Sequence, residues 1–261
     1  MKHTLKRKLQ QLTASILTAL LLLTSIPLQA HASTTQRTFT PAEIDQWITV
    51  TSSVLNYHNH RIPDLFRSNL AAATRRQAEN NSSRILSGNN WNVHSRADLV
   101  RVIESFVVFG HNGAFWDEVY NIAPLMLEVM DNPRAMDELL DLIDAGVLDA
   151  RQANHVFETW DIMLYWGEAG IIAWDMFRIG NLIVWGYHAG HLNREQAREQ
   201  MLPAIHILTH YFDSWEDAVA NYLDGLLYWR GSWDSEVEER HATVERMFAN
   251  PNNLFDNSMF D

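Results

Sequence analysis

Apolar and polar residues recur with a helical period along most of the chain after residue 40. In the segment 96–110, apolar residues return at spacings of three and four, which places them on one face of a helix. Capping signals open several such segments, and Thr40-Pro41-Ala42-Glu43 has every part of a capping box. No series of β-hairpins is indicated. The pattern predicts an all-α fold, a single multi-helix domain of nine to ten helices.

Breaks in the pattern set the bounds of the predicted helices. Gly167 and Gly170 should interrupt or bend the long apolar segment that begins at residue 150. The polar segment 77–90 is predicted to be a mobile loop. Residues 111–113 are predicted to end one helix and separate it from the next. The remaining helices are predicted at 41–59, 63–76, 96–110, 114–130, 133–146, 194–211, 215–230 and 234–250.

The first 32 residues have the three parts of a secretory signal peptide. A basic start at residues 2–8 precedes an apolar run at 12–28, and Ala30-His31-Ala32 offers small residues for cleavage. A retained membrane anchor is the alternative, although the run is short for a span and contains a proline. We therefore expect a secreted or periplasmic, cell-envelope protein. Beyond the signal, the predicted parts are an N-terminal helical hairpin and polar loop (33–90), a helical core (91–233) and a peripheral C-terminal helix and tail (234–261).

Composition narrows the classes of partner. Loss of residues 1–32 would remove four of the 20 basic residues and none of the 32 acidic ones, so 16 basic residues would face 32 acidic ones. A chain this acidic repels phosphate backbones and anionic lipid heads, which argues against nucleic acid and membrane surfaces as partners. The chain has no cysteine, so disulfides and thiol nucleophiles are excluded. All three lysines lie within residues 1–8, so no lysine is left for Schiff-base chemistry.

Tryptophan and tyrosine concentrate between Trp160 and Trp233, interleaved with glycines. Aromatic residues at helical spacing most simply form a hydrophobic core. The alternative is an aromatic-lined groove for a sugar or a peptide. We place the centre of the fold in this Trp-rich stretch.

Five charged residues are considered for catalysis or binding. Asp175 and Arg178 lie one turn apart on an otherwise apolar helix and can pair directly. Glu168 and Asp161 precede Asp175 at spacings of seven, and clustered carboxylates serve as general acid and base or bind a hard cation. The structural alternative is that Arg178 and other arginines neutralise these acids as tertiary ties. Glu195 is added by the resemblance below.

Histidines form a weaker candidate set. His206 and His210 lie four residues apart on one helix face, and His188 and His191 precede that helix. Imidazoles this close in sequence resemble metal ligands, but no HExxH motif accompanies them. No phosphate-binding glycine motif and no GxSxG or SxxK motif is present either. We therefore predict no metal and no cofactor.

Several strings together resemble domain-of-unknown-function family 1266, and this resemblance implies a bacterial, all-helical protein. They are AWDMFR (173–178), WGYHAGHLNREQA (185–197), FDSWEDAVANYLDG (212–225), YWRG (228–231) and the earlier piece at 91–115. The resemblance covers about 91–233 and implies no established activity, cofactor or catalytic residue. The positions that match the family's pattern are Trp91, Gly110, His111, Trp174, Asp175, Arg178, Gly186, Tyr187, Gly190, Glu195, Ala197, Pro203, Phe212, Ser214, Trp215, Tyr222 and Gly225.

Among those positions, Asp175, Arg178, Glu195 and His111 are the polar ones without an evident structural role. The four candidate metal histidines are not part of the pattern. The sequence favours an exported, non-enzymatic helical domain that binds a protein or a cell-envelope component near Trp174, Asp175, Arg178 and Tyr187. The alternative is a carboxylate-based hydrolase acting on envelope polymers, with Glu168 and Asp175 as acid and base. A purely structural protein is a third class.

Overall fold

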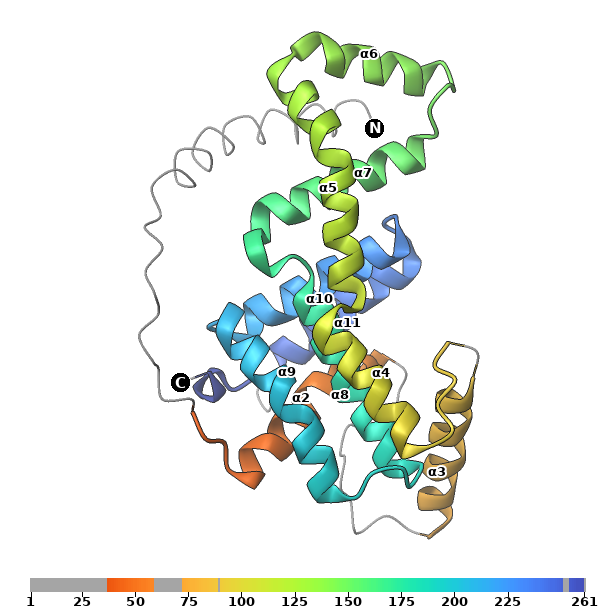
Figure 1. The fold of residues 1–261 in the computed structure, drawn as a ribbon, viewed down its shortest axis with the longest axis vertical. Helices are drawn as coiled ribbons and strands as arrows, with labels where there is room; N and C mark the ends of the chain where they lie inside the picture. Colours follow the sequence, from red (N-terminus) through yellow and green to blue (C-terminus); the bar gives the residue numbers. More distant parts are fainter. Residues whose placement is uncertain (1–36, 59–71, 89, 251–253, 261) are drawn as a thin grey trace. The chain divides into compact units, whose positions relative to one another are not determined.

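The computed structural model describes residues 37–58, 72–88, 90–250 and 254–260 (Figure 1). These residues form ten α-helices and two short 3-10 helices and contain no strand. They divide into two compact units, of which the larger comprises Phe39–Ile122 and Asp149–Asp261 and the smaller includes Ala123–Leu148. The prediction of an all-α fold with a Trp-rich core is confirmed. The predicted signal peptide lies outside the described residues.

The helices follow the capping signals closely. Ser95, Asn193 and Ser214 each accept a hydrogen bond from the backbone of the first turn of the helix that they cap. The helices are α2 (Pro41–His58), α3 (Ala72–Ser87), α4 (Arg96–Val108), α5 (Gly110–Asp131), α6 (Pro133–Asp144), α7 (Ala150–Trp166), α8 (Ile172–His188), α9 (Arg194–Tyr211), α10 (Trp215–Arg230) and α11 (Ser235–Ala249).

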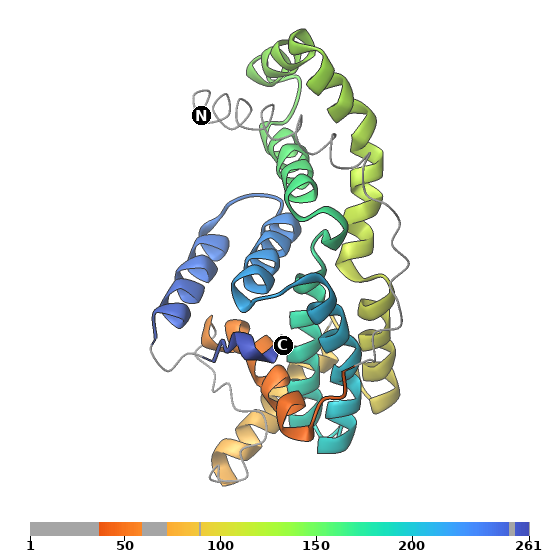
Figure 2. The same cartoon turned by 90° about the vertical axis from the view of Figure 1, so that its left-hand side faces the viewer.

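Helix α8 is the centre of the larger unit. Its residues from Ile172 to Gly186 are all buried except Arg178, which is half-buried. Helices α2, α3, α4, α9 and α10 all pack against it, and Figure 2 shows α8 enclosed between its neighbours. A helix that is apolar on all sides is expected in this position, because each of its faces must be covered.

Two glycines let neighbouring helices approach α8 closely. A methyl group at Gly180 would lie 2.2 Å from the hydroxyl oxygen of Thr51 on α2. At Gly225 on α10 it would lie 2.3 Å from the Cβ atom of Trp174. Both glycines are therefore required by packing.

Phe255 and Met259 near the C-terminus are buried, although Pro251 and the polar residues after it predict a tail that frays. The Trp215 ring lies 5.1 Å from that of Phe260 and 6.1 Å from that of Phe255, measured between centroids. The Trp215 indole N–H also donates to the carbonyl of Asp256 at 3.1 Å. The aromatic rings of Phe255 and Phe260 hold the tail against Trp215. The polar residues between them give no sign of this packing in the sequence.

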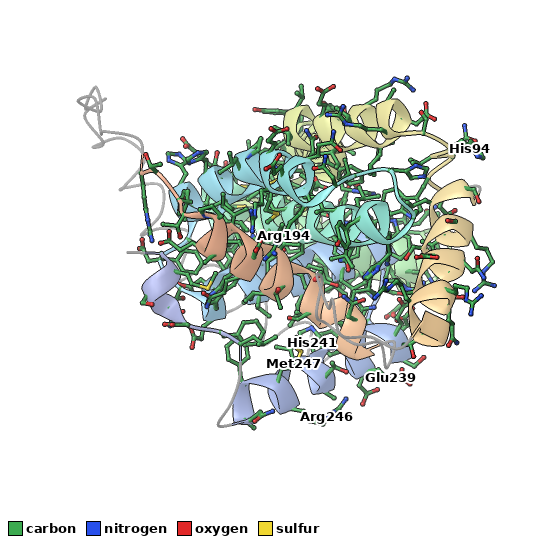
Figure 3. All side chains as sticks on the ribbon, turned by 90° about the horizontal axis from the view of Figure 1, so that it is seen from below. His94, Arg194, Glu239, His241, Arg246 and Met247 are labelled. Atoms are coloured by element: carbon green, nitrogen blue, oxygen red, sulfur yellow. The ribbon has the colours of Figure 1, made fainter. Side chains whose placement is uncertain are left out.

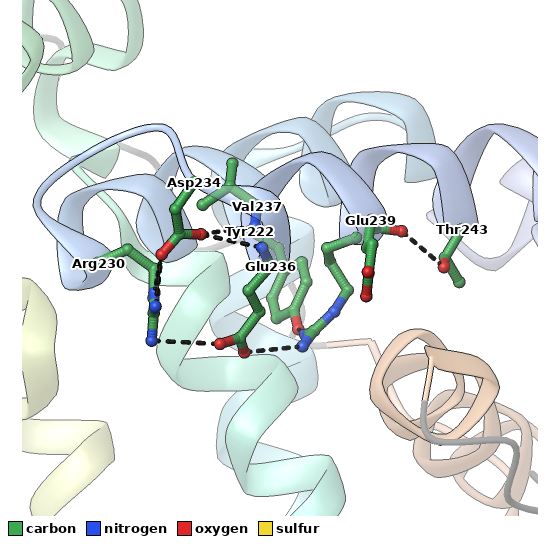
Figure 4. Close-up of polar contacts among 8 residues, drawn as sticks. Tyr222, Arg230, Asp234, Glu236, Val237, Glu239 and Thr243 are labelled. Carbon is green, nitrogen blue, oxygen red and sulfur yellow. Dashed lines mark hydrogen bonds and ion pairs between the residues drawn. The ribbon is translucent and has the colours of Figure 1, made fainter.

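Helix α11 is likewise more than a peripheral cover. Arg240 is only 3% exposed and donates to the hydroxyl of Tyr222 on α10 (Figure 4). Glu236 joins Arg240 to Arg230, which also pairs with Asp234 (Figure 4). Arg246 and Met247, near the C-terminal end of α11, are labelled in Figure 3. Met247 is buried and Arg246 is exposed. The charged residues of α11 thus tie it to α10.

Two further local predictions are wrong. The segment 77–87 is the C-terminal part of α3 and not a loop, because Ser82 and Leu86 lie one turn apart and both are buried. Residues His111–Gly113 lie in the first turn of α5, which begins at Gly110, and the break between the two helices is at Phe109. The helix predicted at 63–76 falls mainly outside the described residues. Within the part that is described, no helix is both long and apolar enough to span a membrane.

Replacing Gly225 with alanine tests the packing of α10 on α8. In an uncrowded helix this substitution raises the free energy of unfolding by about 0.5–1 kcal/mol. Here the added methyl group would overlap Trp174, so we expect a decrease of about 1–3 kcal/mol. Chemical denaturation of both proteins measures the difference. An increase in stability would show that the two helices are less close than described.

Candidate functional site

Asp175 lies in the first turn of α8 and is fully buried. One carboxylate oxygen lies 2.8 Å from Nδ1 of His111, and the other accepts the backbone N–H of Asn112 at 2.8 Å. Both partners belong to the first turn of α5 and are more than 60 residues away in sequence. The buried carboxylate therefore joins the starts of two helices, and both of its oxygens are bonded.

Gly110 allows the chain to wrap around this carboxylate. Its φ is +55°, a left-handed conformation that glycine adopts readily. A methyl group at this position would also lie 2.2 Å from a carboxylate oxygen of Asp175. The Gly-His-Asn sequence at 110–112 is thus explained by one contact: glycine makes room, histidine binds through its ring and asparagine through its backbone.

Two asparagine side chains from other helices bond the N-terminus of α8. The Asn112 side-chain oxygen accepts the N–H of Ile171 at 2.8 Å, and that of Asn221 accepts the N–H of Ala173 at 2.9 Å. The amide of Asn221 also donates to the carbonyl of Gly170 at 2.7 Å. Ile171, at the N-cap, has no side-chain oxygen that could cap the helix, and these bonds take the place of that cap. Because these backbone N–H groups are already bonded, they are not available to bind an anion.

Arg178 follows one turn after Asp175 and is surrounded by aromatic rings. Its guanidinium carbon lies 4.8 Å from the ring centroid of Trp91 and 5.0 Å from that of Trp174. Phe106 and Trp229 lie farther, at 5.8 and 6.0 Å. Cations at such distances are attracted to ring faces. We call these four residues, Trp91, Phe106, Trp174 and Trp229, the aromatic enclosure.

The charge of Arg178 has no bonded partner within the described residues. Its Nε is buried and makes no hydrogen bond, and the side chain forms no ion pair there. Burial lowers the pKa of Arg178, and the nearby charge of Arg240 lowers it further, whereas Tyr222 and Asp175 oppose the shift. An arginine pKa starts so high that the group stays charged at neutral pH. The direct pair predicted between Asp175 and Arg178 is therefore not formed.

His111 and Trp229 bring this region to the protein surface. The His111 side chain is 27% exposed and Trp229 is 48% exposed. The imidazole ring packs against two members of the enclosure, with centroids 5.4 Å from Phe106 and 6.2 Å from Trp174. Because Asp175 holds Nδ1, Nε2 is the nitrogen of His111 that remains for other contacts. The half-buried Arg178 side chain and the imidazole of His111 thus belong to one cluster.

The other predicted site residues lie elsewhere. Glu168 is exposed in the 3-10 helix Gly167–Ala169, and Glu195 is exposed in the first turn of α9. Tyr187 is half-buried near the other end of α8 and packs against His188. Thus Glu168 is exposed to solvent whereas Asp175 is fully buried, so the two proposed acid and base groups have very different environments.

The four histidines make separate contacts. His206 packs against Phe39 and His210 against Tyr211, with ring centroids 5.6 and 4.7 Å apart. His188 and His191 are half-buried. Within the residues that the structure describes, no group of three or more acidic or histidine side chains could hold a metal ion.

Sequence reasoning missed Phe106, Asn112 and Asn221 as parts of this cluster. All three lie in helical segments where a phenylalanine or an asparagine has an ordinary role in packing or on the surface. Their importance comes from contacts between residues 48 to 72 positions apart. Trp91 and His111 were identified only by the resemblance.

Comparison with known proteins identifies the family. A model of DUF1266, a protein family of unknown function, matches residues 88–259, so the chain belongs to this family. The match includes α11, which lies beyond the 91–233 of the resemblance. The chain is also similar to the uncharacterized protein YbeR of Escherichia coli (strain K12), with 27% identity over 57% of this chain and 58% of YbeR. No solved structure matches.

Replacing Asp175 with alanine tests the joint between α5 and α8. The N–H of Asn112 and the ring N–H of His111 would lose a buried acceptor, and each such loss costs about 1–3 kcal/mol. We expect the free energy of unfolding to fall by about 2–6 kcal/mol. The exposed Asp213 provides a control, and its replacement with alanine should change stability by less than about 0.5 kcal/mol. Equal effects would contradict the described bonds.

His188 should make the protein less stable in acid. Burial lowers the pKa of His188 in the folded state, so protonation favours the unfolded chain. Its contribution to stability is complete above the unfolded pKa of about 6.5 and is lost as the pH falls below that value. Between pH 8 and pH 5, the free energy of unfolding measured by denaturation should decline less for His188→Gln than for the unchanged protein. Parallel curves would exclude this contribution.

Proposed function

We propose that this member of the DUF1266 family is an exported binding domain. Its helical core recognises an anionic group, most simply a carboxylate, carried by a protein or a cell-envelope component. The recognising group is Arg178, and the ligand reaches it beside His111 and Trp229. The proposal rests on one observation: the half-buried Arg178 has a fully buried Nε, and its guanidinium has no hydrogen bond or ion pair within the described residues.

A buried charge is normally paired, because the loss of hydration is otherwise uncompensated. The aromatic enclosure contacts the cation but accepts no conventional hydrogen bond from its N–H groups. Those N–H groups lie in the plane of the guanidinium and match the two oxygens of a carboxylate. A bound carboxylate would therefore supply the hydrogen bonds that the fold leaves out.

The positive charge of Arg178 contrasts with the net negative charge of the whole chain. The formal net charge is −12, so most of the surface repels anions. Inside, Asp175 is already bonded to α5, and Arg240 adds a second positive charge near Arg178. Arg240 is itself paired with Glu236, so Arg178 is the positive group of this cluster that a ligand anion would meet. The exposed face of Trp229 would favour an apolar or planar group next to the ligand's carboxylate.

Export is the second part of the proposal and is supported by the sequence of residues 1–32. Fractionation of the source bacterium would test it. The protein should be found outside the cytoplasm and should begin near Ser33. Recovery of the full chain from the cytoplasm would contradict export and leave the binding proposal in place.

The hydrolase alternative requires Glu168 and Asp175 to face each other across a site open to substrate. The complete burial of Asp175, with both oxygens bonded, supports a structural role for that carboxylate. The acid-and-base pair is therefore the less favoured proposal.

Binding can be tested with matched pairs of small probes. Benzoate and N-acetyl-D-alanyl-D-alanine carry a carboxylate, and benzamide and the dipeptide amide do not. We expect NMR titration to show binding of at least one of the two carboxylates and of neither amide. Replacing Arg178 with methionine should weaken that binding at least tenfold, about 1.4 kcal/mol.

A control variant separates this site from general charge effects. Arg198 pairs with Asp45 between α9 and α2, so its replacement with methionine removes the same charge elsewhere. This variant should bind the carboxylate probes unchanged. Equal binding by the Arg178→Met protein, or binding by neither carboxylate, would overturn the proposal.

A further inference from the structure

The smaller unit contains a helical hairpin, residues 123–148, that buries little of its own apolar surface. It consists of the last turns of α5, a turn at Asn132 and helix α6. Of its twelve Leu, Ile, Val and Met side chains, only Met126 and Val129 are buried. A segment of 26 residues is well below the size of about 40 at which a chain begins to form a sufficient core alone. Its exposed apolar surface therefore requires an explanation.

Helix α6 concentrates this surface in a stripe. Met136, Leu139, Leu140 and Ile143 follow the spacing i, i+3, i+4, i+7 and so share one face, yet each is only half-buried. Val147, just beyond the end of the helix, is 69% exposed. Residues with this spacing are those that a second helix contacts when it packs alongside.

A row of carboxylates runs beside the stripe. Asp137, Asp141 and Asp144 are four and three residues apart, so they form a line along α6. The hairpin contains six acidic residues and a single basic one, Arg134, and all six acidic residues are exposed. The surface is therefore apolar in the middle and negative along one border.

We propose that this hairpin binds a basic amphipathic helix of a partner protein. The partner helix would pack apolar residues at i, i+3, i+4 and i+7 against the α6 stripe. Its lysines or arginines would lie along the row at Asp137, Asp141 and Asp144. This interaction is independent of the Arg178 site, which lies in the larger unit.

Charge decides between the possible occupants. A second copy of the hairpin would bring two strongly acidic surfaces together, and like charges oppose such a contact. A bilayer with anionic head groups would be repelled in the same way. A helix with apolar and basic faces satisfies both parts of the surface, the stripe by burial and the carboxylates by charge.

A designed peptide provides the probe. It has eighteen residues, with leucines at the helical spacing and lysines elsewhere. A second peptide has glutamate in place of lysine, and a third has the leucines and lysines in a non-periodic order. Fluorescence anisotropy with the chain from Ser33 should show binding of the first peptide at least tenfold tighter than of either other peptide.

Two variants locate the contact. Asp137→Asn, Asp141→Asn and Asp144→Asn together should weaken binding of the Leu-Lys peptide at least tenfold. The matched control, Asp213→Asn with Glu238→Gln and Glu245→Gln, changes net charge equally at exposed positions in the larger unit. It should change binding less than twofold. Leu140→Ser with Val147→Ser should also weaken binding tenfold, with circular dichroism unchanged.

Three outcomes would overturn the proposal. Equal losses in the aspartate and control variants would show attraction by net charge alone. Binding of the Leu-Lys peptide by the chain from Ser33 but not by the full chain would assign the surface to residues 1–32, which are themselves basic and apolar. A dimer in sedimentation that the Leu140→Ser, Val147→Ser variant abolishes would assign the surface to a second copy.

Discussion

The larger unit depends on the hydrogen bonds that the buried carboxylate of Asp175 makes with the start of α5. The carboxylate accepts hydrogen bonds from the side chain of His111 and the backbone of Asn112, and in doing so it fixes the first turn of α5 against the first turn of α8. A carboxyl group that is buried away from water is stable only when hydrogen bonds satisfy its oxygens. This requirement explains a glycine at 110, where any side chain would occupy the place of the carboxylate.

Because Asp175 is bonded to α5, it does not pair with Arg178. On one helix turn, Asp175 and Arg178 would be natural partners, but α5 has already bonded the acid. Arg178 is instead held between Trp91 and Trp174, with Phe106 and Trp229 beyond them. The fold therefore separates the two charges and leaves the positive one without a hydrogen-bond acceptor among the residues that the structure describes. Such an arrangement is poor for stability and suitable for recognition of an anion, which is why we assign the site to Arg178.

The parts of the fold that depend on local sequence were predictable. Capping residues such as Ser95 and Asn193 determine where helices begin, and the apolar run of α8 indicates burial on every side. Most of helix α3 was missed because, among its described side chains, only Ser82 and Leu86 are buried. The packed tail was missed because Phe255 and Phe260 are isolated in sequence. The bond between His111 and Asp175 spans 64 positions, and no local pattern encodes it.

The most direct test of this account is the stability of the Arg178→Met protein without any ligand. If Arg178 is kept for binding, methionine removes a desolvated charge and packs in the same aromatic surroundings. The free energy of unfolding should then stay within about 1 kcal/mol of the original or rise, as when buried charges are replaced by apolar residues. A loss of about 3 kcal/mol or more, the effect of breaking a buried pair, would show that Arg178 is a structural tie and contradict the account.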